Sequence, residues 1–289
     1  MELLLHQVLS GLATGGIYAS VALALVMIYQ ATHLVNFAQG EMAMFATYIC
    51  WSLLQAGLPY WVAFFLTVII AFVGGILIQR LIMRPVENAP VLSVVIVFIG
   101  LLVIFHSIAG WIYSYTIKPF PSPFPKEPLF GNTYMGSHEL GAMAVTLVVL
   151  ALVFAFFRFT PLGLAMRAAA QNPVSSRLVG VRVSWMLALG WGLAAAIGAV
   201  AGVMVAPIVY LEPNMMGGIL LYAFAGALLG GIDSPGGAVI GGFLVGVIEN
   251  VVGMYLGTEL KLTVALIIIV TVLVLKPSGL FGRVHVARV

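Results

Sequence analysis

The chain has 289 residues, of which 63% are hydrophobic and only 7% are charged, and its formal net charge is +3. A soluble domain carries about 25% charged residues, so a water-soluble fold of this size is excluded. No basic cluster alternates with aromatic residues, which argues against nucleic-acid binding, and the single cysteine, Cys50, leaves no basis for disulfides or cysteine-ligated zinc.

Nine stretches are apolar enough to be candidate membrane-spanning helices, which need roughly 17–25 mostly apolar residues. They are Val8–Tyr29, Met42–Ala56, Tyr60–Leu81, Val91–Tyr113, Gly141–Phe157, Trp185–Val209, Gly217–Gly231, Gly236–Leu256 and Leu262–Leu275. Several are short, and Gly217–Gly231 is the weakest; if it is re-entrant, eight full spans remain. We predict an all-α, polytopic membrane helix bundle that forms one transmembrane domain over residues 1–289.

The orientation follows from the basic residues, since cytoplasmic loops are enriched in Lys and Arg. With nine spans, nine of the twelve basic residues fall on one face. These nine are Arg80, Arg84, Arg158, Arg167, Arg177, Arg182, Lys276, Arg283 and Arg288. We therefore predict that this face is cytoplasmic, with the N-terminus outside and the C-terminus inside.

A polar segment between the first two spans contains Asn36, Gln39 and Glu41. Backbone that leaves a helix near lipid must be buried in protein or line a water-filled cavity. Asn36 could cap the second helix, and Glu41 would then lie at its positive end. Alternatively, the three side chains lie beside a transport path.

The segment 118–128 carries five prolines and is predicted to be an extended outer loop, because proline lacks the amide donor and fixes φ. It could contact a soluble partner or act as a stiff connector.

The longest cytoplasmic loop, residues 158–184, is predicted to contain two short helices. Thr160-Pro161 and Asn172-Pro173 each match an N-cap followed by proline at the first helical position, and Gly180 is a natural helix stop. Arginines add positive charge, and alanines at 165, 168, 169 and 170 would let another protein approach closely. The loop is either a docking surface or a solvated linker.

A second polar interruption, Leu211–Gly218, follows the sixth span. Gly11-Leu12-Ala13 begins the segment before the first break, and Gly192-Leu193-Ala194 begins the segment before the second. This faint similarity suggests an inverted repeat whose breaks mark a pathway.

Glycine pairs one helical turn apart follow, and they predict close helix packing, within this chain or against a partner. They are Gly226 and Gly230, Gly237 and Gly241, and Gly242 and Gly246. The turn at residues 232–236 between these helices matches a capped helix start.

Glu249 lies inside an apolar span, and an intramembrane acid is a functional candidate, although it could also be wetted or neutral. The five histidines show neither metal-ligand spacing nor an obvious acid–base partner, so we expect no catalytic residue, metal or cofactor. There is no GxxxxGK[ST] phosphate loop, so ATP-driven transport would need a separate ATPase polypeptide.

Five segments in this order resemble the permeases of ATP-binding-cassette importers for branched-chain amino acids, specifically the shorter of two paired membrane subunits. They are residues 35–41 (VNFAQGE), 84–86 (RPV), 163–172 (GLAMRAAAQN), 201–204 (AGVM) and 228–242 (LLGGIDSPGGAVIGG).

The resemblance implies a homologous second permease, two cytoplasmic ATPases, a periplasmic substrate-binding protein and a multi-pass location in the bacterial inner membrane. It also implies that the loop around 163–180 couples to the ATPase. The expected interface residues are Gly163, Arg167, Ala169, Asn172, Arg177 and Gly180. An acidic residue common in that loop is absent, and Gln171-Asn172 stands in its place.

The expected function is alternating-access transport of branched-chain or related amino acids without chemistry on the substrate. The expected pathway residues are Asn36, Gln39, Glu41 and Glu249. The alternative is a secondary transporter in which Glu41, Glu212 or Glu249 carries coupling protons, and a non-transporting membrane scaffold is a third possibility. Related permeases carry other amino acids, urea, amides or small aromatic acids, so the solute stays open.

Overall fold

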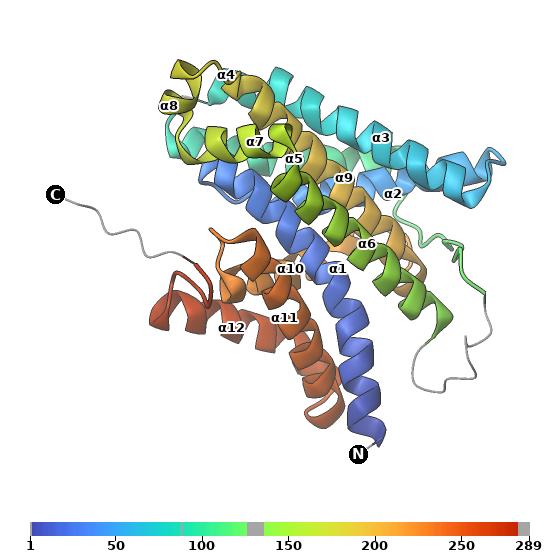
Figure 1. Cartoon of the computed structure of the whole chain (residues 1–289). Coiled ribbons are helices and arrows are strands. Elements are labelled where there is room, and N and C mark those ends of the chain that lie inside the picture. The colour runs from blue at the N-terminus through green and yellow to red at the C-terminus, as the bar shows by residue number, and fades with distance from the viewer. Residues whose placement is uncertain (1, 88, 126–135, 283–289) are drawn as a thin grey trace. The chain divides into compact units, whose positions relative to one another are not determined.

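The computed structural model describes residues 2–87, 89–125 and 136–282. Over these residues the chain is helical, and its β structure is one isolated antiparallel bridge between Lys118 and Leu211. The all-α prediction is therefore confirmed. The α-helices, labelled in Figure 1, are α1 (Glu2–Thr32), α2 (Gln39–Gln55), α3 (Tyr60–Ile78), α4 (Arg84–Val86), α5 (Val91–Tyr113), α6 (Ser137–Phe159), α7 (Pro161–Gln171), α8 (Pro173–Leu178), α9 (Val183–Val209), α10 (Met215–Gly230), α11 (Pro235–Tyr255) and α12 (Lys261–Leu275).

Seven helical segments within the described residues are long and apolar enough to cross a bilayer. The two other predicted spans correspond to α2, with 17 residues, and α10, with 16 residues. At 1.5 Å per residue each is about 25 Å long, against about 30 Å of hydrocarbon. Both short helices directly follow a polar break, so each can cross only if its break dips below the membrane surface. The count of nine and the orientation stay predictions.

The chain divides into two compact units. The first comprises Met1–Val26, Phe124–Ala144 and Gly217–Val289, and the second comprises Met27–Pro123 and Val145–Met216. The boundaries fall inside α1, α6 and α10, so each of these helices contributes to both units.

In the second unit, α9 packs against α2 and α3, and α2 also contacts α3 and α5 (Figure 1). Its core contains the fully buried side chains of Tyr48, Phe98 and Trp191. Glycines let α3 and α9 approach closely: a Cβ on Gly75 would lie 2.5 Å from the carbonyl oxygen of Trp191. Any larger residue there would push the helices apart.

In the first unit, the predicted glycine pairs pack within the chain. Gly226 of α10 faces Gly242 of α11, where an added Cβ would lie 2.7 Å from the Gly242 Cα. Gly246 of α11 lies against Gly15 of α1 at backbone contact. The glycines therefore join α1, α10 and α11 by main-chain packing, which is the geometry that small residues permit in lipid.

The two Gly-Leu-Ala segments, from which an internal repeat is predicted, both lie at close helix contacts. In the first unit Gly11 of α1 meets Val247 of α11, and in the second unit Gly192 of α9 meets Phe72 of α3. In each case a long helix is followed by a break and a short helix. The first unit contains most of α1 with α10 and α11, and the second contains α9 with α2 and α3; the repeat itself stays a prediction.

Two irregular segments have local causes. The end of α3 continues as a π-helix, Gln79–Met83, in which Arg84 N–H donates to the carbonyl oxygen of Gln79, because Pro85 has no N–H and disturbs the α-helical ladder before it. The described part of the proline segment, 118–125, is not helical, as predicted, and Lys118 N–H donates to Leu211 O at 2.9 Å. Residues 126–128, Arg283 and Arg288 lie outside the described residues.

Candidate functional site

Asn36 organises the first break but does not cap α2. Its side chain is fully buried, and its Oδ1 accepts a hydrogen bond from Ala38 N–H at 3.0 Å. The N-cap position of α2 is Ala38, which makes no side-chain cap hydrogen bond. The capping prediction is therefore wrong: Asn36 stabilises the turn ahead of the helix, because its side chain satisfies a backbone donor that the break leaves free.

Gln39 lies in the interface between α2 and α9. Its Nε2 donates to the carbonyl oxygen of Ala194 at 3.0 Å, next to Gly198, where a Cβ would lie 2.6 Å from that nitrogen. The Oε1 of Gln39 is buried and has no hydrogen-bond partner among the described residues. Because a buried acceptor without a partner costs about 1–3 kcal/mol, Gln39 presents an unused polar group inside the membrane domain.

Glu41 pairs with a histidine that the sequence did not indicate. The Nδ1 of His106, on α5, lies 3.3 Å from Glu41 Oε2, with side-chain exposures of 27% and 13%. The His106 ring also packs at 5.7 Å from the ring of Tyr115. The expectation that no histidine has an acidic partner is corrected here: the packing of α2 on α5 joins two residues that are 65 positions apart.

Glu249 is 7% exposed and has two partners from distant parts of the sequence. Tyr18 of α1 donates its hydroxyl to Oε2 at 2.7 Å, and Lys261 Nζ at the start of α12 lies 3.0 Å from Oε1. The stem of Lys261 passes Gly253, which has no side chain to obstruct it. Glu249 is therefore a paired acid, and Tyr18 and Lys261 were not predicted.

The four predicted pathway residues do not fall within one unit. Asn36, Gln39 and Glu41 belong to the second unit, whereas Glu249 belongs to the first. Within the described residues no group of three His, Cys, Asp or Glu side chains could hold a metal ion. The polar groups of these residues are hydrogen-bond donors and acceptors and opposite charges, held within or next to helices.

The loop between α6 and α9 folds as its local signals predict. Thr160 Oγ1 accepts from Gly163 N–H at 3.0 Å and starts α7, and Asn172 Oδ1 accepts from Ser175 N–H at 2.9 Å and starts α8. Gly180 ends the segment with φ of 85°, a conformation that costs glycine little. Both caps are satisfied, so the two short helices have defined ends.

The expected interface residues of this loop divide into two groups. Gly163 is packed on the end of α6, where a Cβ would lie 2.7 Å from the Cα of Phe157, and Ala169 is fully buried within the chain. Both therefore serve the packing of α7 and offer no side chain to a partner. The exposed members are Arg167, Asn172, Arg177 and Gly180.

Beside them, α8 and the residue after it present a second exposed feature, an apolar one. Val174, Leu178 and Val179 are 68%, 84% and 79% exposed. We call Arg167, Val174, Arg177, Leu178 and Val179 the loop surface. Apolar side chains flanked by arginines are typical of protein interfaces.

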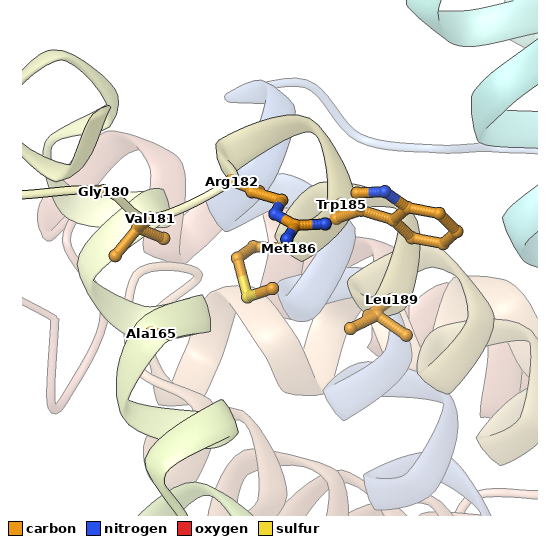
Figure 2. Close-up of a pocket in the computed structure, with 7 residues that line it drawn as sticks. All are labelled: Ala165, Gly180, Val181, Arg182, Trp185, Met186 and Leu189. Carbon is orange, nitrogen blue, oxygen red and sulfur yellow. The ribbon is translucent and has the colours of Figure 1, made fainter.

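An open hollow of about 490 Å³ lies where this loop enters α9. It is lined by Ala165 of α7, Val181 and Arg182 of the connecting segment, and Trp185, Met186 and Leu189 of α9 (Figure 2). No sequence signal predicted this hollow, because its walls come from two helices that meet only in the folded chain.

Comparison with known proteins shows which protein family the chain resembles in sequence. A family model described as "Branched-chain amino acid transport system / permease component" matches residues 7–275. The chain is 30% identical over 300 residues to the high-affinity branched-chain amino acid transport system permease protein LivH of Escherichia coli (strain K12), covering 99% of this chain and 97% of the relative. It is 30% identical over 301 residues to BraD of Pseudomonas aeruginosa, a permease protein of the same description, covering 99% and 98%.

A solved structure shares the fold at low sequence identity. A chain of PsaBC from Streptococcus pneumoniae, in complex with Fab, superimposes with a TM-score of 0.52 at 12% identity, covering 93% of this chain and 91% of that chain.

Proposed function

The chain belongs to the family of branched-chain amino acid transport system permease components, and we propose that it is the membrane subunit of an ATP-binding-cassette importer that passes branched-chain amino acids across a bacterial inner membrane. The observation that carries this proposal is the extent of similarity: the family model covers residues 7–275, which includes all of the second unit, most of the first, the loop and both breaks.

The proposed partners are a homologous second permease, two ATPases and a periplasmic substrate-binding protein. The loop at residues 158–184 is proposed to dock the ATPase through the loop surface. The two capped helices support this role, because a segment that transmits motion must be rigid, and caps keep the ends of short helices from fraying. Asn172 starts α8 and Gly180 ends the segment after it, whereas Arg167 and Arg177 supply exposed charge.

The proposed topology has nine spans, with the N-terminus outside and the loop surface in the cytoplasm, over one domain of residues 1–289. Cysteine labelling tests it, since the native Cys50 is buried. A cysteine at Gln171 should react with an impermeant maleimide only from the cytoplasmic side, and one at Thr116 only from outside. Labelling of both positions from one side would refute the topology, because α6 separates them.

We propose that Asn36, Gln39, Glu41 and Glu249 lie beside the path of the substrate. The unused Oε1 of Gln39 supports this for one of them, because a passing ammonium group can occupy a buried acceptor. Gln39→Met keeps the side-chain length but removes both polar atoms. Uptake should fall while the amount of folded protein stays unchanged, whereas unchanged uptake would remove Gln39 from the path.

Reconstitution with candidate partner subunits in vesicles tests the function directly. Radiolabelled leucine, isoleucine or valine should accumulate only with ATP and binding protein, and accumulation should stop when the catalytic glutamate of the ATPase is replaced. Uptake that collapses with a proton gradient and ignores the ATPase would favour the proton-coupled alternative. Absence of flux under either energy source would favour a scaffold.

A further inference from the structure

The hollow between α7 and α9 combines apolar walls with a cation at its rim. Val181, Met186 and Leu189 form the walls, and the guanidinium group of Arg182 extends over Met186 toward Trp185 (Figure 2). The guanidinium of a second arginine, Arg80, lies 3.6 Å from the centre of the Trp185 ring. Arg182 therefore places a positive group at the rim of a mostly apolar opening, and Arg80 stacks on the Trp185 ring that forms part of its wall.

The depth of the hollow indicates a membrane-derived occupant. The candidate span that contains α9 begins at Val183, and Trp185, Met186 and Leu189 lie in its first two turns. At 1.5 Å per residue, Leu189 is about 9 Å farther along the helix axis than Val183. The 27 residues of α9 are about 40 Å long against about 30 Å of hydrocarbon, so its first two turns can lie in the headgroup layer, which lipid occupies and which a soluble protein would have to enter.

The charges indicate the headgroup. No acidic side chain lines the hollow, and no ion pair of Arg182 is found in the part of the chain that the structure describes. Arginine forms its strongest hydrogen bonds with phosphate and carboxylate oxygens, and basic pockets between membrane helices bind anionic lipid headgroups.

We propose that this hollow binds one phospholipid with a net negative headgroup. Its phosphate lies near Arg182, the rest of its headgroup packs beside the Trp185 ring, and one acyl chain follows Met186 and Leu189. The proposal needs only that α9 spans the bilayer, so it can fail while the transport function stands, and the reverse also holds.

Native mass spectrometry of the full-length protein with its partner subunits tests this proposal. The complex is released from nanodiscs that contain equal amounts of phosphatidylglycerol and phosphatidylcholine. Wild type should retain one phosphatidylglycerol in preference to phosphatidylcholine. Arg182→Gln should lower this preference about fivefold, the contribution of one arginine near an anionic surface. Arg158→Gln is the matched control, because it removes an exposed arginine that does not line the hollow and should change nothing.

A second variant fills the hollow without changing charge. Leu189→Trp should reduce retention of the bound phosphatidylglycerol while the thermal unfolding temperature of the complex stays near that of wild type. Equal retention of both lipids by wild type, or equal losses in Arg182→Gln and Arg158→Gln, would overturn the proposal.

Two further experiments distinguish a bound lipid from other occupants of the hollow. Displacement of phosphatidylglycerol by millimolar inorganic phosphate alone would assign the site to a free anion. A photoreactive residue at Met186 should crosslink to lipid, and a crosslink to the ATPase instead would assign the hollow to the protein interface.

Discussion

Replacing Lys261 by methionine should destabilise the first unit strongly, because it leaves Glu249 buried without its cation. The two charged atoms lie 3.0 Å apart, and the side-chain exposures are 28% for Lys261 and 8% for Glu249. Coulomb's law at an effective dielectric constant of 20 gives about 5.5 kcal/mol of attraction before any desolvation cost. Since Lys261 is partly wetted, we expect a loss of about 3 kcal/mol, at the lower end for breaking a buried pair.

Removing the acid of this pair should cost less stability than removing its cation. Glu249→Gln should cost only about 1 kcal/mol, because the long stem of Lys261 can carry its ammonium group toward water, and glutamine can still accept from Tyr18. The double variant Glu249→Gln/Lys261→Met should recover most of the loss, to within about 1 kcal/mol of wild type, since no buried charge is left unpaired.

The assay is the free energy of unfolding in lipid bicelles, measured by steric trapping. Lys276→Met is the control, because it removes an exposed lysine at the other end of α12. The reasoning fails if Lys261→Met is no less stable than Lys276→Met. It also fails if the double variant is as unstable as Lys261→Met alone.

Three further predictions follow from the packing and the caps. Gly246→Val should abolish folded protein, as judged by size-exclusion chromatography in detergent, because its side chain would meet the backbone of α1; Gly74→Val, where nothing lies within 4 Å, should be tolerated. Asn172→Ala should cost about 1 kcal/mol of local helix stability, because it removes the cap of α8. It should also lower the amount of amino acid imported per ATP hydrolysed without lowering expression. An unchanged ratio would count against a coupling role for the two loop helices. His106→Ala should lower ATP-driven uptake several-fold, because it leaves half-buried Glu41 without its partner, and His106→Gln should restore part of the rate; equal rates in both variants would argue against a role for this pair.

The buried position of Ala169 changes how the loop can be tested. A tryptophan at Ala169 would overpack the contact of α7 with the rest of the chain, so lost uptake would report misfolding and not lost docking. Exposed positions avoid this problem. Leu178→Asp at 84% exposure should weaken ATPase copurification while leaving the chain folded.

The sequence alone determined the features that depend on neighbours within a few residues. The apolar runs identify helices, because only a helix satisfies its own backbone in lipid, and Thr160, Asn172 and Ser234 mark helix starts, because each side chain reaches the N–H three residues ahead. The glycine pairs of α10 and α11 likewise predicted close contact, since the sequence by itself shows where a helix lacks side chains.

Only the tertiary structure decided which distant residues meet. Glu249 is joined to Tyr18 across 231 positions, and Glu41 to His106 across 65, and no spacing rule connects such pairs. Ala169 reads as part of an open alanine face but is buried, because the rotation of α7 against its neighbours depends on packing and not on helix propensity. The hollow at Trp185 likewise depends on how α7 packs against α9. Hydrogen bonds within a helix are set locally, whereas ion pairs, buried faces and cavities arise from contacts that the chain makes only once its helices have assembled.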